Sequence, residues 1–328
     1  MRWLLMLTVV LLGSSLSLAK GPKYTDIDKA GVDYRVQGEY VGLVETKGGK
    51  EKYGVQLIAL GNHHFRVVGY RGGLPGAGWN GKGPAQLQGD VELKNGQLLF
   101  EGDQRRGLLK DGHIAVDLGP DGNTDGELKR IDRQSPTLGK QPPTGAVVLF
   151  DGTSVEHFEG GRLTKDGLLM EGTRSRHKFQ SHQLHIEFQL PFQPEDRGQG
   201  RGNSGIYVQG RYEVQMLDSF GLAGKHNECG GIYEVQDPRL NMCFPPLTWQ
   251  TYDIAFTAAK FDEAGKLTRP ARITVHHNGV SVHQGVELPR DRSTRAAPLK
   301  PGPEPGPIYL QNHGCPVRYR NIWVLETK

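Results

Sequence analysis

The chain has 328 residues, and its 40 basic and 36 acidic side chains are spread along the whole length, for a formal net charge of +4. No block of Lys and Arg is interleaved with aromatic residues, which argues against a nucleic-acid-binding protein. Beyond the N-terminal region no apolar stretch approaches the roughly 20 residues of a transmembrane helix. The composition is therefore typical of a soluble globular protein.

Residues 1–19 have the layout of a secretory signal peptide. Arg2 supplies the positive charge, residues 4–12 are apolar, and Ser17 and Ala19 stand at positions −3 and −1 of a cleavage site. The apolar run is too short to cross a bilayer, and no cysteine for a lipid anchor lies nearby. We expect an exported protein, periplasmic or secreted, with no membrane attachment once the signal peptide is removed.

Residues 20–133 are expected to form a β-rich N-terminal module, because short alternating runs end at Gly, Asn or Asp. The predicted strands are residues 34–44, 53–60, 64–70, 86–93, 97–101 and 113–118. No motif in this module indicates an activity.

Near its end, this module contains acidic residues with the spacing of a calcium-binding loop. Asp121, Asn123, Asp125, Gly126 and Asp132 match the ligand positions of an EF-hand loop. Helices flank such a loop, whereas the residues on both sides alternate like strands. We therefore expect a hairpin turn without calcium. The sequence predicts no cofactor, although it leaves open a divalent metal in the cleft of the second module.

Residues 134–145 are rich in Pro, Gly, Ser and Thr and are predicted to be a linker. The second module, residues 146–328, contains nine further short runs typical of strands, which favours an all-β sandwich or jelly roll. These strands are residues 184–190, 204–209, 212–217, 231–236, 249–257, 271–279, 280–288, 308–313 and 319–326. The three cysteines, Cys229, Cys243 and Cys315, form no C-x-x-C motif, and their pairing stays open.

Two carboxylates stand out in the second module. Period-2 alternation puts Glu187 and Glu213 on the polar faces of their strands, each beside an amide side chain. If both strands belong to one sheet, the two carboxyl groups face a common cleft and suit glycoside chemistry as acid and base. The alternative is an ordinary solvated face. His185, His276, His277 and His283 are expected at the surface.

Further polar clusters add to this candidate site. Gln311 and His313 follow a strand directly, and Arg318 and Arg320 come soon after, which is a dense set of groups for a sugar or a carboxylate. A glycine-rich loop is a plausible rim or lid. The candidate catalytic residues are Glu213, Glu187 and His313, and the candidate substrate-binding residues are Asn203, Tyr207, Gln215, Asp218, His226, Gln311, Arg318 and Arg320.

Together these segments resemble the 3-keto-disaccharide hydrolase family, whose fold is similar to the concanavalin A-like sandwiches. The resemblance rests on residues 149–152, 184–188, 203–221, 229–233, 249–254, 273–280 and 306–324, which span the second module in order. The N-terminal module resembles only a β-rich extension of some exported members. One departure is Asn312, where the family commonly has Asp.

The resemblance implies cleavage of a glycoside whose C3 hydroxyl has been oxidised to a ketone, by hydrolysis or by elimination and hydration. Such a reaction needs a base, an acid for the glycosidic oxygen, and donors for an enolate. Two alternatives stay open. A lectin-like binding module would line a flat face with exposed aromatic residues. An endo-glucanase would carry a second acid where this chain has Gln215.

Overall fold

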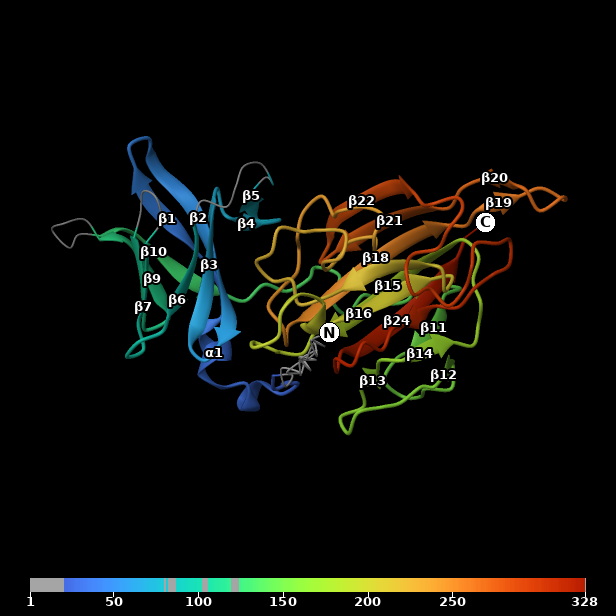
Figure 1. Ribbon diagram of the computed structural model, residues 1–328, viewed down its shortest axis with the longest axis horizontal. Helices are drawn as coiled ribbons and strands as arrows, with labels where there is room; N and C mark the ends of the chain where they lie inside the picture. The colour runs from blue at the N-terminus through green and yellow to red at the C-terminus, as the bar shows by residue number, and fades with distance from the viewer. Residues whose placement is uncertain (1–20, 80, 82–86, 102–105, 119–123, 328) are drawn as a thin grey trace, which may run out of the picture.

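Alternating apolar residues separated by glycine-rich turns fold into an almost entirely β structure, as the sequence predicts. The structure, a computed structural model, describes residues 21–79, 81, 87–101, 106–118 and 124–327. It consists of a curled sheet near the N-terminus and a two-sheet sandwich that occupies the rest of the chain (Figure 1). Residues 1–19, the predicted signal peptide, lie outside the described residues. No helix among the described residues is long and apolar enough to cross a membrane.

The first sheet has eight antiparallel strands in the order β6-β3-β2-β1-β10-β9-β8-β7. Its edge strands β6 and β7 follow each other in the chain and lie side by side, so the sheet closes into what we call the N-terminal barrel. The strands are β1 Gly38–Thr46, β2 Gly49–Gly61, β3 His64–Arg71, β6 Leu87–Glu92, β7 Leu98–Glu101, β8 Arg106–Lys110, β9 His113–Leu118 and β10 Thr124–Ile131. The small pair β4 Leu74–Pro75 and β5 Gly78–Trp79 lies beside it. Apolar side chains such as Tyr40, Leu57 and Phe65 fill the interior, as in other eight-stranded barrels.

The sandwich contains a seven-stranded and a five-stranded sheet. The seven-stranded sheet consists of β11 Val147–Phe150, β24 Arg318–Glu326, β15 His182–Gln189, β18 Trp249–Thr257, β21 Arg272–His277, β22 Val280–Glu287 and the short β13 Leu169–Met170. The five-stranded sheet consists of β12 Phe158–Glu159, β14 Thr173–Ser175, β23 Tyr309–Leu310, β16 Ser204–Val208 and β17 Tyr212–Met216. β19 Lys260–Phe261 and β20 Leu267–Arg269 form a separate hairpin.

Each sheet buries one face against the other. Ile186 and Phe188 of β15 and Val214 and Met216 of β17 belong to the same apolar core. Because side chains alternate along a strand, the polar residues between them point out of the sandwich on its two opposite sides. This alternation decides where each candidate site residue lies.

The barrel packs closely against the sandwich. Phe192 and Leu247 belong to the sandwich sequence but are buried in the barrel's apolar core. Phe220 packs with Ile58 and Tyr70 of the barrel in a second cluster. The contact between the two parts therefore has an apolar component that is continuous with the core of the barrel.

Three predicted strands differ from the structure: residues 34–44 begin in a helix, residues 231–236 form no strand, and of residues 308–313 only Tyr309–Leu310 is a strand. Residues 34–36 belong to the short helix α1 Gly31–Val36, which follows the 3₁₀ turn η1 Ile27–Lys29. Asp33 of this helix accepts hydrogen bonds from the backbone and ring of His63, which fixes the helix on the barrel. Residues 231–236 form a turn in place of a strand, with Glu234 in the left-handed region at φ 54°.

The calcium-like spacing falls partly outside the described residues, which resume at Thr124. β10 begins at Thr124 and pairs with Leu118 of β9, so the flanks are strands and not the helices of an EF-hand. Among the described residues, no group of three or more His, Cys, Asp or Glu side chains is arranged to hold a metal ion.

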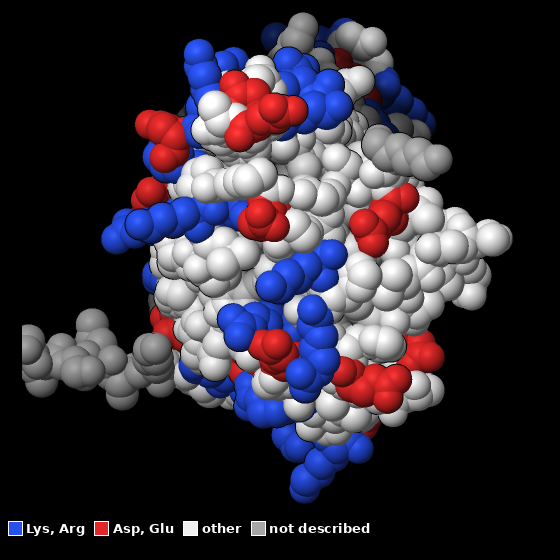
Figure 2. Space-filling model, turned by 90° about the vertical axis from the view of Figure 1, so that its right-hand side faces the viewer, with Lys and Arg blue, Asp and Glu red and all other residues white. Residues whose placement is uncertain are grey.

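Acidic and basic side chains lie next to each other over the end of the sandwich shown in Figure 2. The sandwich carries exposed ion pairs, such as Arg272 with Glu287 at 3.4 Å and Arg174 with Glu159 at 2.6 Å. Exposed pairs of this kind add little to stability.

Candidate functional site

The β16–β17 hairpin brings the central residues of the site together. In its antiparallel register Tyr207 stands opposite Glu213, and Gly205 stands opposite Gln215. The Tyr207 hydroxyl donates a hydrogen bond of 2.7 Å to Glu213 Oε2. A Cβ atom at position 205 would overlap Glu213 Oε1, so only glycine leaves room for the carboxyl group.

A cavity of about 300 Å³ opens on the outer face of this hairpin. That volume is at the lower end for small-molecule sites and suits one sugar ring better than two. Its lining consists of Gln199, Asn203, Glu213, Gln215, Tyr233, Arg295, Ala296, Gln311 and His313. Five of the sequence-predicted site residues therefore lie in one pocket: Asn203, Glu213, Gln215, Gln311 and His313.

Burial controls the electrostatics of the pocket. Glu213 is 2% exposed, and this burial raises the pKa of its carboxyl group to about 8, against the opposing effect of the Tyr207 hydrogen bond. Among the described residues, only Tyr207 hydrogen-bonds the carboxylate, through Oε2. Oε1 has no such partner and is not among the fully buried polar atoms, so it is the oxygen open to the pocket that Glu213 lines. Glu213 thus holds its proton near neutral pH and exchanges it within the range where general acid–base catalysts work.

Three amide side chains, of Gln199, Asn203 and Gln215, line the same pocket as this carboxyl group. Gln199 Oε1 accepts hydrogen bonds of 3.0 Å from both Asn203 and Gln215, and Gln199 Nε2 donates to the backbone oxygen of Asn227. Asn203 Oδ1 is buried and has no partner among the described residues. Because buried acceptors are normally satisfied, this oxygen is available to a ligand hydroxyl.

Gln311 joins the pocket from β23. Its backbone N–H binds the Gly205 oxygen at 2.9 Å, and its side-chain amide donates to the Tyr207 hydroxyl at 3.1 Å. His313 follows two residues later and is exposed at the mouth of the pocket. Tyr207 itself lies behind the pocket and acts on it through Glu213 and Gln311.

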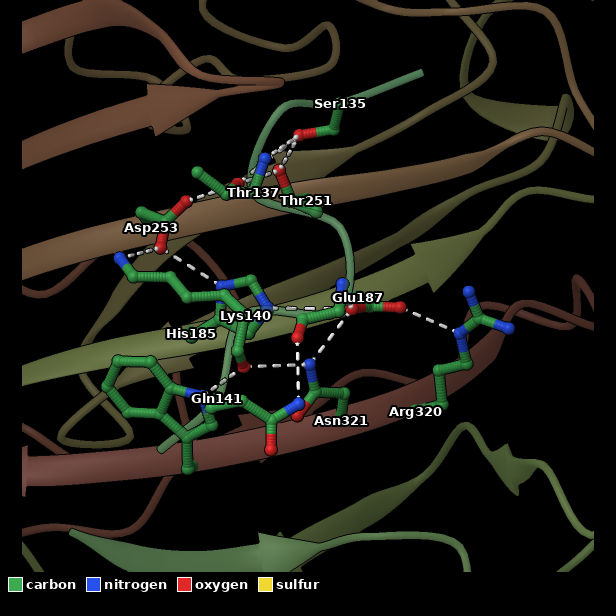
Figure 3. Close-up of polar contacts among 12 residues, drawn as sticks. Ser135, Thr137, Lys140, Gln141, His185, Glu187, Thr251, Asp253, Arg320 and Asn321 are labelled. Atoms are coloured by element: carbon green, nitrogen blue, oxygen red, sulfur yellow. Dashed lines mark hydrogen bonds and ion pairs between the residues drawn. The ribbon is translucent and has the colours of Figure 1, made fainter. Parts of the chain in front are cut away.

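The expectation that Glu187 and Glu213 share a cleft is wrong. β15 belongs to the seven-stranded sheet and β17 to the five-stranded sheet, so the two carboxylates leave the sandwich on opposite sides. Glu187 Oε1 accepts hydrogen bonds from Gly139 N at 2.5 Å and Asn321 at 2.9 Å, and Oε2 accepts one from Arg320 at 2.7 Å (Figure 3). Although burial opposes it, these partners together with His185 lower the pKa of Glu187 to about 2.

Figure 3 shows why this face is closed: residues 135–141 of the linker cross it. Thr137 and Lys140 bind Asp253, at 2.7 and 2.8 Å, and Asp253 also contacts His185 at 3.0 Å. The expectation that His185, His277 and His283 lie at the surface is therefore wrong, because each is at most 3% exposed. This network fastens the linker to the sheet, and within it His185 Nε2 makes no hydrogen bond to a described residue and lies 3.7 Å from Glu187 Oε1.

The remaining predicted residues lie away from the pocket. Asp218 forms a buried ion pair of 2.6 Å with Arg201. Arg318 pairs with Glu171 at 3.3 Å, and Arg320 stacks on the Trp249 ring at 3.9 Å. His226, on the glycine-rich loop, binds Asp237 through its backbone N–H. None of these four predicted residues belongs to the lining of the pocket.

Sequence reasoning missed four lining residues: Gln199, Tyr233, Arg295 and Ala296. They come from irregular loops, where no periodicity indicates which way a side chain points. The loop that carries Arg295 reaches β17 through Thr294, whose hydroxyl accepts a hydrogen bond of 2.9 Å from Glu213 N. That contact joins segments more than eighty residues apart, so no pattern in the neighbouring sequence predicts it.

Asn312, where the resemblance leads us to expect Asp, is exposed and lies outside the lining. Its Oδ1 accepts a hydrogen bond of 2.8 Å from the Gly314 backbone. We predict that Asn312→Asp changes kcat/KM by less than about 2-fold, because surface exchanges that keep their hydrogen bond change energies little. Steady-state kinetics of both proteins test this, and a rise of tenfold or more would place this side chain in the reaction.

The sandwich part of the chain is similar to known proteins. Residues 145–325, more than half of the chain, match the model of the 3-keto-alpha-glucoside-1,2-lyase-like domain family. A crystal structure of a candidate glycosyl hydrolase from Parabacteroides distasonis is 33% identical, with a TM-score of 0.51, over 56% of this chain and 85% of that chain. A second candidate glycosyl hydrolase from the same organism is 16% identical, with a TM-score of 0.41, over 56% of this chain and 94% of that one. No curated protein matches the chain.

Proposed function

The chain belongs to the 3-keto-alpha-glucoside-1,2-lyase-like domain family, and we propose that it cleaves 3-keto-glycosides by elimination, with Glu213 removing the proton at C2. The family and its glycosyl-hydrolase-like neighbour support a carbohydrate-active role. The observation that carries the finer proposal is a buried carboxyl group, with its pKa raised to about 8, in the wall of a sugar-sized pocket.

The ketone makes this chemistry possible. A carbonyl at C3 acidifies the neighbouring C2–H, so a general base can take that proton and leave an enolate. The enolate electrons then form the C1–C2 double bond as the C1–O bond breaks. The leaving alcohol takes up a proton, and the sugar ring is released as an enone. Addition of water to the double bond afterwards gives the free 3-keto sugar, so the net result equals hydrolysis.

The pocket supplies a side chain for each step of this reaction. The ionised form of Glu213, through Oε1, is the base for C2–H. Amide and guanidinium donors of Gln311 and Arg295 line the same pocket and can stabilise negative charge on the enolate oxygen. His313 stands at the mouth, where a leaving group too large for the cavity would lie, and it is the proposed proton donor to the glycosidic oxygen.

We expect kcat/KM to rise with pH. Glu213 accepts a proton only when ionised, and a pKa of about 8 means that the ionised fraction grows as the pH rises toward that value. We predict that kcat/KM rises about tenfold per pH unit below pH 8 and then levels off. A pH–rate profile of kcat/KM tests this. A profile that is flat below pH 8 and falls above it would assign Glu213 the role of general acid.

The substrate class is tested by comparing matched sugars. The purified protein is incubated with 3-keto-trehalose and 3-keto-lactose beside trehalose and lactose, and released monosaccharide or enone is measured. We expect products from the 3-keto sugars alone. Cleavage of the unoxidised sugars at a similar rate would favour an ordinary glycosidase, and binding without cleavage would favour a lectin.

A further inference from the structure

The segment from Gln193 to Gly202, which we call the pocket loop, lies between the N-terminal barrel and the pocket. It follows β15 and precedes β16, and it includes the 3₁₀ turn η2 Gly198–Gly200. Phe192, directly before the loop, is buried in the barrel core and exchanges two backbone hydrogen bonds of 2.9 Å with Tyr24. The loop therefore begins at a residue that the barrel already fixes.

One side of the pocket loop is bound to the end of β2. Arg197 donates a hydrogen bond of 2.7 Å to the Leu60 oxygen, and Arg201 donates one of 2.9 Å to the Ala59 oxygen. A Cβ atom on Gly61 would lie only 2.6 Å from Glu195 Cγ, so the barrel and the loop meet there without a gap. Arg201 is 5% exposed and also holds Asp218 of the sandwich.

The other side of the pocket loop reaches the cavity through Gln199. Its carboxamide joins Asn203, Gln215 and the Asn227 backbone in one set of hydrogen bonds. Two of those partners line the pocket, and Asn203 keeps a buried oxygen free for a ligand. Gln199 uses its own polar atoms on these protein partners, so its effect on a substrate passes through the side chains it orients.

We propose that the N-terminal barrel is part of the substrate site: by holding the pocket loop it fixes Gln199, and Gln199 aims the amides of Asn203 and Gln215 at the bound sugar ring. Gln199, Arg197 and Arg201 are then positioning residues. The inference rests on the proposed function for the identity of the ligand, but the hold of the barrel on the loop does not depend on that identity.

The first test measures the loop directly. Arg197→Ala removes a bond to the barrel together with two bonds inside the loop, to the backbone oxygens of Pro194 and Asp196. Gly61→Val leaves those inner bonds in place and pushes the barrel against Glu195. Two variants serve as controls. Arg106→Ala removes an exposed arginine of the barrel, and Gly112→Val places the same side chain at a similar positive φ with open space around it.

Hydrogen–deuterium exchange is followed for residues 193–202 in all five proteins. We expect exchange there to be at least about 5-fold faster in Arg197→Ala and Gly61→Val and unchanged in the controls, because a released loop opens more often. If Gly61→Val does not fold, the exchange rates of Arg197→Ala alone decide whether the barrel holds the pocket loop. Unchanged exchange in a folded Arg197→Ala protein would overturn the proposal.

The second test follows the route to the substrate with a double-mutant cycle. We expect Arg197→Ala to raise KM at least about 5-fold with kcat nearly constant, since amides that bind the ring act on ground and transition state alike. In a Gln199→Ala background the same change should raise KM by less than about 2-fold, because coupled residues are not additive. An equal rise in both backgrounds would overturn the route through Gln199. If the wild-type protein cleaves no 3-keto-glycoside, the proposed function fails, and the exchange experiment still decides whether the barrel holds the loop.

Discussion

Glu213→Gln is expected to lower kcat on a 3-keto-glycoside at least about 100-fold, the usual contribution of a general base. The amide keeps the shape of the side chain and an oxygen that can accept the Tyr207 hydroxyl, but it cannot take a proton. Steady-state kinetics at pH 8 measure the loss. Glu159→Gln is the control, because Glu159 is an exposed carboxylate of the same five-stranded sheet.

Although Glu213→Gln loses activity, it should be more stable than the wild-type protein as the pH rises. Burial raises the pKa of folded Glu213 to about 8, above its usual value of 4.5, so the folded protein favours the protonated form. Its favourable contribution is complete below pH 4.5 and is lost as the pH rises through 8. Glu213→Gln should therefore be increasingly more stable than the wild type between these pH values. Full activity in the variant, or a lower melting temperature that accounts for the lost activity, would contradict the catalytic role.

Asp218→Ala is expected to lower the free energy of unfolding by about 3–5 kcal/mol, because it leaves the Arg201 charge buried without its partner. The ion pair measures 2.6 Å, and both side chains are nearly inaccessible to water. Urea unfolding of wild-type and variant proteins measures the loss. Glu287→Ala removes an exposed partner of two arginines and should cost less than about 1 kcal/mol.

This prediction also separates two roles for Asp218, which the sequence places among the substrate-binding residues. A structural role lowers stability, and any rise in KM then accompanies that loss, because Asp218 holds Arg201 and with it the pocket loop. A direct contact with the sugar would instead raise KM strongly at nearly unchanged stability, and that result would contradict the position of Asp218 outside the pocket.

Alternation along the chain was enough to predict the all-β fold and most strands, including both strands that carry the candidate carboxylates. It also predicted correctly that Glu187 and Glu213 point away from the core. It could not tell which sheet each strand joins, because that depends on pairing between distant segments. β15 pairs with β18 and β24, whereas β17 pairs with β16. Two outward-facing carboxylates with the same local pattern therefore ended on opposite sides of the sandwich.

Burial was the second property that local patterns did not reveal. His185 stands at a polar position of its strand, yet it is fully buried, because residues of the linker cover that face. Gln199 was not predicted to belong to the site, yet it lines the pocket, because an irregular loop that the barrel fixes carries it there. Both placements depend on segments that follow no periodicity, and both required the tertiary structure.

The most direct test of C2 proton removal by Glu213 uses a 3-keto-glycoside carrying deuterium at C2. The products are analysed by mass spectrometry after cleavage by the wild-type protein, with Glu213→Gln as the control. Elimination predicts a sugar product that has lost the deuterium to solvent, together with slower turnover than for the unlabelled substrate. Release of the leaving group with the C2 deuterium retained would show direct displacement at C1 and would contradict the proposed reaction.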